Sequence, residues 1–117
     1  METPDLEIEI CERPGGRLIR LRGPVTMGSL FELQDAVRQG DGDLTIDLSQ
    51  VPYMDSAGLG AILGAFASCQ RTSRRFGLVA VPDRVMTLLK VAGVDKILPQ
   101  FASLEAAEGR AAKAESA

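Results

Sequence analysis

Strand-like and helix-like segments alternate along this chain of 117 residues. Apolar residues recur with a period of two over 6–11, 17–22 and 44–48, which is typical of strands with one buried face. Apolar residues recur at helical spacing over 27–38 and 56–71. Strands separated by helices of this length pair in parallel through right-handed crossovers. The alternation therefore indicates an α/β fold.

The first two strands are separated only by the break at 14–16, Pro-Gly-Gly, which predicts an antiparallel hairpin. Together with the later crossovers, this hairpin predicts a small mixed sheet with helices packed on it. The helix over 27–38 has two candidate starts. Ser29 with Glu32 matches a capping box, and Thr26 is a competing N-cap.

The C-terminal half continues the same pattern. Apolar residues over 77–81 predict another strand, and a helix over 82–93 opens with proline and ends at glycine. Ile97 and Leu98 are predicted to form a last short strand. Ser103 is predicted to cap a final helix that runs through Glu108.

The length fits one domain, which we expect to cover 1–108. The remainder, 109–117, has no apolar face and is expected to be a disordered tail. Because the N-terminus lacks the basic and apolar regions of a signal peptide, and no apolar run reaches the ~20 residues that span a bilayer, we expect a cytoplasmic protein without membrane insertion.

The sequence contains no histidine. This excludes Ser-His-Asp and Cys-His relays, His-ligated zinc or haem, and an imidazole pH switch. The two cysteines, Cys11 and Cys69, are too few for a disulfide framework and too far apart for a CxxC knuckle. Both are expected to be small buried hydrophobes, and no cofactor or metal is expected.

The charge balance is mildly acidic, with 13 Lys and Arg against 16 Asp and Glu, a net charge of −3. This balance argues against direct binding of nucleic acid, which rests on a basic surface. Arg71, Arg74 and Arg75 follow the predicted helix 56–71, where cations favour the negative end of the helix dipole. A basic docking patch is the alternative interpretation of these three arginines.

Three glycines, Gly58, Gly60 and Gly64, lie within the helical pattern of 56–71. Each costs a helix interior about 1 kcal/mol relative to alanine, so the pattern needs a compensating reason. Close packing on the sheet is expected to explain Gly64. Access for a ligand or a partner better suits Gly58, in the first turn. Packing alone stays an alternative for all three.

Nucleotide-binding motifs are excluded around these glycines. The chain has no GxxxxGK[ST], and the glycine spacing does not fit GxGxxG. Ser56 has no histidine or SxxK partner that would make it a nucleophile. Either Asp55 or Ser56 is expected at the helix N-cap, and a cap with no further role is the alternative interpretation. A phosphate on Ser56 would suit the free N–H groups of the helix N-terminus.

The stretch from Asp47 to Gly60, DLSQVPYMDSAGLG, resembles the signature of STAS domains, and most closely that of bacterial anti-sigma factor antagonists. The resemblance extends over about 6–108 and includes Leu-Arg-Gly at 21–23 and LLKVAGV at 88–94. Its most specific part is the D-S-x-G-L-G core. It implies a single STAS-like domain with a mixed four- or five-stranded sheet and helices packed mainly on one face.

The resemblance also implies partner switching without enzymatic activity. The unmodified antagonist would bind an anti-sigma factor serine kinase and free the sigma factor. Phosphorylation of Ser56 would reverse this, and a metal-dependent serine phosphatase would reset it. The partner-binding residues would be Asp55, Ala57, Gly58, Leu59, Gly60 and Thr26.

One position departs from the family pattern. Thr26 stands where an acidic residue is common, so a contact that needs a carboxylate is missing. This keeps a second function open, a structural STAS subunit of a lipid-transport ATPase or of a stressosome-like scaffold. A weak homodimer also stays open. An enzyme that works through Asp43, Asp47 and Asp55 is the weakest alternative, because they form no evident pair.

Overall fold

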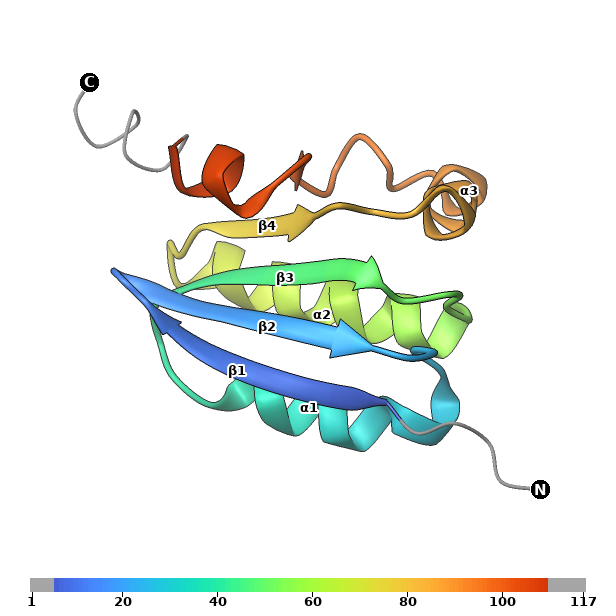
Figure 1. Ribbon diagram of the computed structural model, residues 1–117, viewed down its shortest axis with the longest axis horizontal. Coiled ribbons are helices and arrows are strands. Elements are labelled where there is room, and N and C mark those ends of the chain that lie inside the picture. The colour runs from blue at the N-terminus through green and yellow to red at the C-terminus, as the bar shows by residue number, and fades with distance from the viewer. Residues whose placement is uncertain (1–5, 110–117) are drawn as a thin grey trace.

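A computed structural model describes residues 6–109 of the protein (Figure 1). In chain order the elements are β1 (Glu7–Arg13), β2 (Gly16–Arg22), the 3-10 turn η1 (Met27–Ser29), α1 (Leu30–Arg38), β3 (Asp43–Gln50), α2 (Ser56–Arg71), β4 (Phe76–Val79), α3 (Asp83–Ala92) and β5 (Gln100–Phe101). A short helix at 104–109 follows β5. The predicted tail, apart from residue 109, lies outside the described residues.

The five strands form one mixed sheet in the order β1-β2-β3-β4-β5. β1 and β2 are antiparallel, as the hairpin predicted, and every later pairing is parallel. Gly15 has a φ of +80°, in the left-handed region that favours glycine, and it forms the hairpin turn. The predicted α/β class, hairpin and crossovers are confirmed, with five strands rather than four.

The main core lies between the sheet and α1 and α2, which cover the same face of it (Figure 1). Alternate residues of β3, Leu44, Ile46 and Leu48, are at most 1% exposed. Full burial of each such side chain is worth about 1.5–3 kcal/mol. Cys69 on α2 is buried in the same core, as predicted, and burial raises the pKa of its thiol. The alternating burial of the β3 side chains therefore identifies the face of the sheet that α1 and α2 cover.

The opposite face of the sheet also buries some side chains, but fewer of them. Leu18 and Val79 are buried but do not belong to the main core. A Cβ on Gly77 would come within 2.9 Å of the Phe101 ring, so this ring rests directly on β4. Cys11 is only half-buried, so the prediction of a buried Cys11 was wrong, because β1 is one of the two edge strands of the sheet.

Two local predictions were also wrong. The last strand is Gln100–Phe101, after Pro99, and does not include Ile97 and Leu98. The N–H groups of both predicted residues donate to the carbonyl of Val94, which makes a turn, and Leu98 is buried in the main core. The preceding strand, β4, begins and ends slightly earlier than the predicted 77–81. The predicted cap at Ser103 is confirmed, since its Oγ accepts from the N–H of Ala106 at 3.1 Å.

At residues 6–109, no helix combines the length and apolar character that crossing a membrane requires.

Candidate functional site

Asp55 is the N-cap of α2, and Ser56 is the first helical residue. The Oδ1 of Asp55 accepts a hydrogen bond from the N–H of Gly58 at 2.9 Å. This bond satisfies one of the donors that every helix leaves free in its first turn. The structure thus decides between the two predicted caps, and it leaves the hydroxyl of Ser56 outside the capping interaction.

The second carboxylate oxygen of Asp55 ties α2 to another part of the chain. Its Oδ2 accepts from the N–H of Met27, in η1, at 3.1 Å. Backbone bonds run alongside, from the N–H of Asp55 to the carbonyl of Val25 and from the N–H of Val25 to the carbonyl of Tyr53, both 3.1 Å. The loops that follow β2 and β3 are therefore held side by side at the carboxyl ends of these two parallel strands.

Thr26 begins η1 at the same place. Its Oγ1 accepts from the N–H of Gly28 at 3.3 Å, and its own N–H donates to Ser29 Oγ at 3.2 Å. This reciprocal pair is a capping box. Thr26 is thus the N-cap of the 3-10 turn, whereas Ser29 makes no side-chain cap for α1. The Thr26 hydroxyl is therefore used within the chain.

Two of the three glycines of α2, Gly58 and Gly64, do not have the predicted roles. A Cβ on Gly58 would lie 2.2 Å from the carbonyl oxygen of Val25, so the absence of a side chain lets α2 pack against the loop after β2. At Gly60 and Gly64 a Cβ would meet nothing within 4 Å. Packing therefore explains Gly58 and not Gly64, the reverse of the expectation. The spacing of residues within one helix does not indicate which of its turns packs against a segment from elsewhere in the chain.

The predicted partner-binding residues divide into exposed and buried sets. Ser56 and Gly60 are exposed, and Asp55 and Ala57 are half-buried. Gly58 and Leu59 are buried, and Leu59 belongs to the main core with 6% of its surface exposed. The exposed set lies on the solvent side of the first turns of α2, whereas the buried set packs beneath it.

Sequence reasoning missed two large apolar side chains beside this helix start. Met27 is 68% exposed, although its spacing assigned it to the buried face of the helix over 27–38. That assignment was wrong because α1 begins only at Leu30, after the 3-10 turn. Phe31, in the first turn of α1, is 71% exposed. The signal in the sequence was that Phe31 lies off the apolar face of the predicted helix, where an exposed aromatic side chain is unusual. We call Met27 and Phe31 the apolar pair.

The acidic residues weighed for catalysis do not come together. Asp43 lies at the start of β3 and Asp55 lies beyond its end, which separates them by about 20 Å or more. The Oδ1 of Asp47 accepts from the N–H of Ser49 at 2.9 Å, and its Oδ2 lies 3.6 Å from the guanidinium of Arg20. These carboxylates act as caps and ion-pair partners within the fold.

Comparison with known proteins identifies the family to which this chain is related. The family model described as "Mlab, STAS domain" matches residues 12–99. The anti-sigma-B factor antagonist of Staphylococcus aureus is 30% identical over 98 residues, which cover 80% of this chain and 91% of that protein. The anti-sigma-B factor antagonist of Listeria monocytogenes is 40% identical over 55 residues, and there the chain spans about half of the relative's length (48%).

A solved structure shows the same fold. The anti-sigma factor antagonist SpoIIAA in its unphosphorylated form superposes with a TM-score of 0.73 at 21% identity, covering 92% of this chain and 96% of that one. The five-stranded mixed sheet and the family model agree with what the resemblance implied. The chain belongs to the STAS domain family.

Proposed function

We propose that the chain is an anti-sigma factor antagonist that acts by partner switching. In the unmodified form it binds an anti-sigma factor that is a serine kinase, and the sigma factor is released. The kinase phosphorylates Ser56, the complex dissociates, and a metal-dependent phosphatase removes the phosphate. The chain acts in the cytoplasm as a binding protein and supplies the phosphate acceptor but no catalytic group.

The position of Ser56 carries the proposal. Its side chain is exposed at the start of α2, and the adjacent Asp55 already uses its carboxylate on the N–H groups of Gly58 and Met27. A kinase can reach this hydroxyl without unfolding any element. The names of the relatives support the same function, since the matched Staphylococcus aureus protein is an anti-sigma-B factor antagonist.

Phosphorylation would change this surface in charge and leave the fold intact. A phosphoserine carries about −1.5 to −2 charges at pH 7. The N–H groups of the first turn and the helix dipole offset that charge within the chain. A partner that buries the same surface would have to desolvate the phosphate beside Asp55. Such a mismatch costs about 2–5 kcal/mol, which corresponds to a factor of tens to thousands in affinity.

In this proposal the apolar pair provides an exposed apolar contact surface for the partner. Met27 and Phe31 are the two most exposed large apolar side chains near this helix start, and buried aromatic anchors dominate protein interfaces. In this proposal Asp55, Ala57 and Gly60 contact the partner directly. Gly58 and Leu59 act from beneath by seating α2 on the loop after β2, and Thr26 holds the turn that presents Met27.

The test is phosphorylation of the full chain by its cognate anti-sigma factor kinase with ATP, followed by intact mass. We expect the mass of one phosphate on the wild type and none on Ser56→Ala. Ser49→Ala is the matched control, because Ser49 is also exposed at the end of β3, and it should be modified like the wild type. Phosphate that persists on Ser56→Ala would disprove the assignment.

Binding of Ser56 variants to the same kinase distinguishes partner switching from the second function predicted from the sequence, a structural subunit of an ATPase or a scaffold. Partner switching predicts that Ser56→Glu weakens kinase binding about tenfold or more. A structural subunit would keep its partner whatever the state of Ser56.

A further inference from the structure

The two edges of the sheet differ greatly in length. β5, at one edge, has only two residues, whereas β1, at the other edge, has seven. Figure 1 shows β1 along the outer side of the sheet. A free edge exposes a row of backbone N–H and C=O groups with which another strand can pair. β1 is therefore the edge at which an added strand can extend the sheet.

The hydrogen bonds around β2 show which backbone groups of β1 point outward. Gly23, directly after β2, donates its N–H to the carbonyl of Gln50 in β3 at 3.0 Å. Because backbone groups alternate in direction along a strand, the even-numbered residues of β2 face β1, where they pair with the odd-numbered residues of β1. The N–H and C=O groups of Ile8, Ile10 and Glu12 therefore point away from the sheet. Within residues 6–109 these groups form no hydrogen bond.

β1 lacks the features that usually protect the edge of a sheet. Its sequence, EIEICER, contains no proline and no lysine, and its pairing with β2 runs without a bulge. Each of its three glutamates stands in register with an arginine of β2: Glu7 with Arg22, Glu9 with Arg20, and Glu12 with Arg17. The acidic charge of β1 is therefore offset within the hairpin, and the edge stays open to a second strand.

An exposed apolar side chain lies at the middle of this edge. Ile10 is the central residue of β1, and 37% of its surface is exposed. Ile8, which points to the same face of the sheet, packs against the main core. On the β2 side, Ile10 is in register with Ile19, which is fully buried. A strand placed beside β1 would cover apolar surface that Ile10 leaves in water, which favours pairing.

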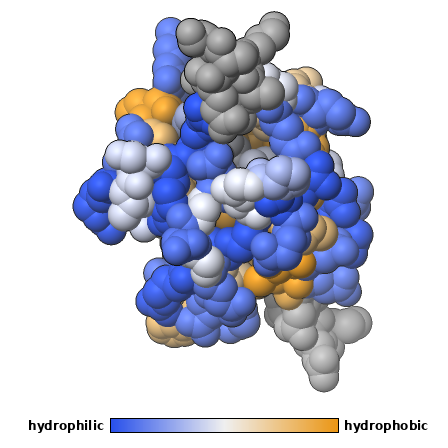
Figure 2. All heavy atoms as spheres, turned by 90° about the vertical axis from the view of Figure 1, so that its left-hand side faces the viewer, coloured by the Kyte–Doolittle hydropathy of each residue, from blue (hydrophilic) through white to orange (hydrophobic). Residues whose placement is uncertain are grey.

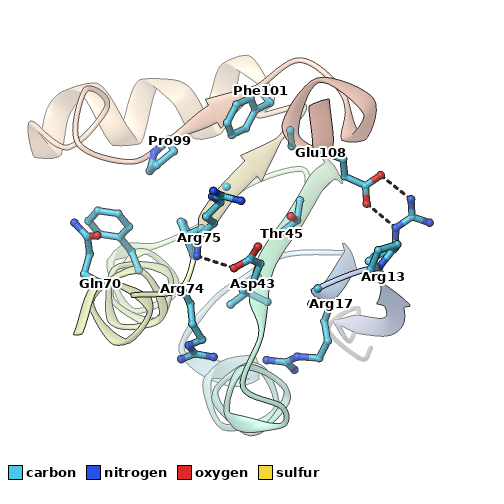
Figure 3. Close-up of a pocket in the computed structure, with 18 residues that line it drawn as sticks. Arg13, Arg17, Asp43, Thr45, Gln70, Arg74, Arg75, Pro99, Phe101 and Glu108 are labelled. Atoms are coloured by element: carbon cyan, nitrogen blue, oxygen red, sulfur yellow. Dashed lines mark hydrogen bonds and ion pairs between the residues drawn. The ribbon is translucent and has the colours of Figure 1, made fainter. Parts of the chain in front are cut away.

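The end of β1 is anchored to the rest of the fold. Arg13 and Glu108, on the helix at 104–109, point toward each other (Figure 3), and both N–O distances of their ion pair are 2.7 Å. Figure 2 shows this end of the molecule, where hydrophilic side chains cover most of the visible surface. A strand that is already ordered loses less conformational entropy when it pairs with another.

We propose that β1 pairs antiparallel with β1 of a second copy of this chain, about a two-fold axis through Ile10, so that two sheets become one. In this register Ile10 faces Ile10, and Ile8 faces Glu12 of the second copy. These are the residues whose backbone groups point outward, so they form three pairs with two hydrogen bonds each. The interface is the same patch on both copies, which closes the dimer.

The side chains select this register over its neighbours. Glu9 faces Cys11 of the second copy, and Glu7 faces Arg13, so no carboxylate lies directly opposite another. A shift of two residues in one direction places Glu9 opposite Glu9, which is unfavourable. A shift in the other direction places Cys11 opposite Cys11 and loses one of the three hydrogen-bonded pairs. Because the contact is confined to two strands, we expect a weak dimer with a Kd of about 100 μM.

Sedimentation of the full chain between about 10 μM and about 1 mM tests the dimer. Ile10→Lys places two like charges at the axis and should weaken association about tenfold or more. Val91→Lys is the matched control at another exposed apolar residue, on α3, and it should associate like the wild type. Ser56→Glu should also associate normally, which keeps this result independent of the proposed function. A chain that stays monomeric at about 1 mM overturns the proposal and leaves the edge to a strand of a different protein.

A disulfide tests the register without depending on the stability of Ile10→Lys. Glu9→Cys places a thiol directly opposite Cys11 of the second copy, in a pair that is not hydrogen-bonded and whose side chains lie close together. After mild oxidation, we expect a covalent dimer on a non-reducing gel. The wild type, Glu7→Cys and the double variant Glu9→Cys with Cys11→Ser should each stay monomeric on the gel. A covalent dimer of any of these three would place the strands in another register and overturn the proposed one.

Discussion

The backbone N–H of Met27 donates to the Oδ2 of Asp55 at 3.1 Å, and this bond joins the turn before α1 to the start of α2. The other oxygen of the same carboxylate caps α2 through Gly58. One side chain therefore sets the relative position of the apolar pair and Ser56. Both parts of the proposed docking surface depend on it.

The dual role of Asp55 predicts a graded loss of stability. Asp55→Ala removes both acceptors, and it should lower the free energy of unfolding by about 1–3 kcal/mol, the cost of a lost cap plus a second hydrogen bond. Asp55→Asn keeps a single carbonyl oxygen and should lose less. Urea unfolding measures both variants. Asp35→Ala, which removes an exposed carboxylate of α1, is the control and should stay within about 0.5 kcal/mol of the wild type. Equal stability of Asp55→Ala and the wild type would contradict the dual role.

The glycines of α2 predict substitutions of opposite sign. Gly58→Ala places a Cβ against the backbone of Val25, which must move, so it should destabilise the protein by about 1–3 kcal/mol. Gly60→Ala and Gly64→Ala meet open space and should stabilise it by up to about 1 kcal/mol each, because alanine favours a helix. Thermal unfolding of the three variants checks the signs, and a stabilising Gly58→Ala would disprove the packing role.

The ion pair of Glu108 with Arg13 predicts a local acid transition. The hydrogen bond and charge of Arg13 hold the pKa of Glu108 below its ordinary value. The pair therefore stabilises the helix at 104–109 above the ordinary pKa of a glutamate, and this contribution is lost as pH falls through the lowered value. Carbon chemical shifts of 104–109 between neutral and acid pH measure it.

Glu108→Gln should abolish that transition and leave the helix frayed at neutral pH. The matched control is Glu105→Gln, an exposed glutamate on the same helix, which should keep the transition. A transition that persists unchanged in Glu108→Gln would exclude the pair as its cause.

The apolar pair predicts a loss of binding without a loss of stability. Met27→Ser and Phe31→Ser remove side chains that are mostly exposed in the free protein, so unfolding should change by less than about 0.5 kcal/mol. Affinity for the cognate kinase should fall about tenfold or more for Phe31→Ser, since aromatic anchors dominate interfaces. Calorimetric titration measures it. Val91→Ser on α3, at a residue 81% exposed, is the control, and a similar loss there would remove the apolar pair from the interface.

The sequence by itself determined the features that depend on neighbours along the chain. Period-two and helical patterns predicted the hairpin, the crossovers and the extent of α2, since burial of one face imposes the same spacing wherever the element lies. The D-S-x-G-L-G core indicated the family and placed Ser56 at a helix start. The cap was narrowed to Asp55 or Ser56, because both residue types offer an oxygen to the free N–H groups.

Only the tertiary structure decided what depends on segments distant in sequence. Position 58 requires a residue without a side chain because the loop after β2 packs against it. No spacing of residues within α2 indicates that contact. Met27 is exposed because a 3-10 turn precedes α1, and a 3-10 turn breaks the helical period. The ion pair of Arg13 with Glu108 joins two segments that lie 95 residues apart in the sequence. Contacts across the fold, rather than local pattern, therefore set these features.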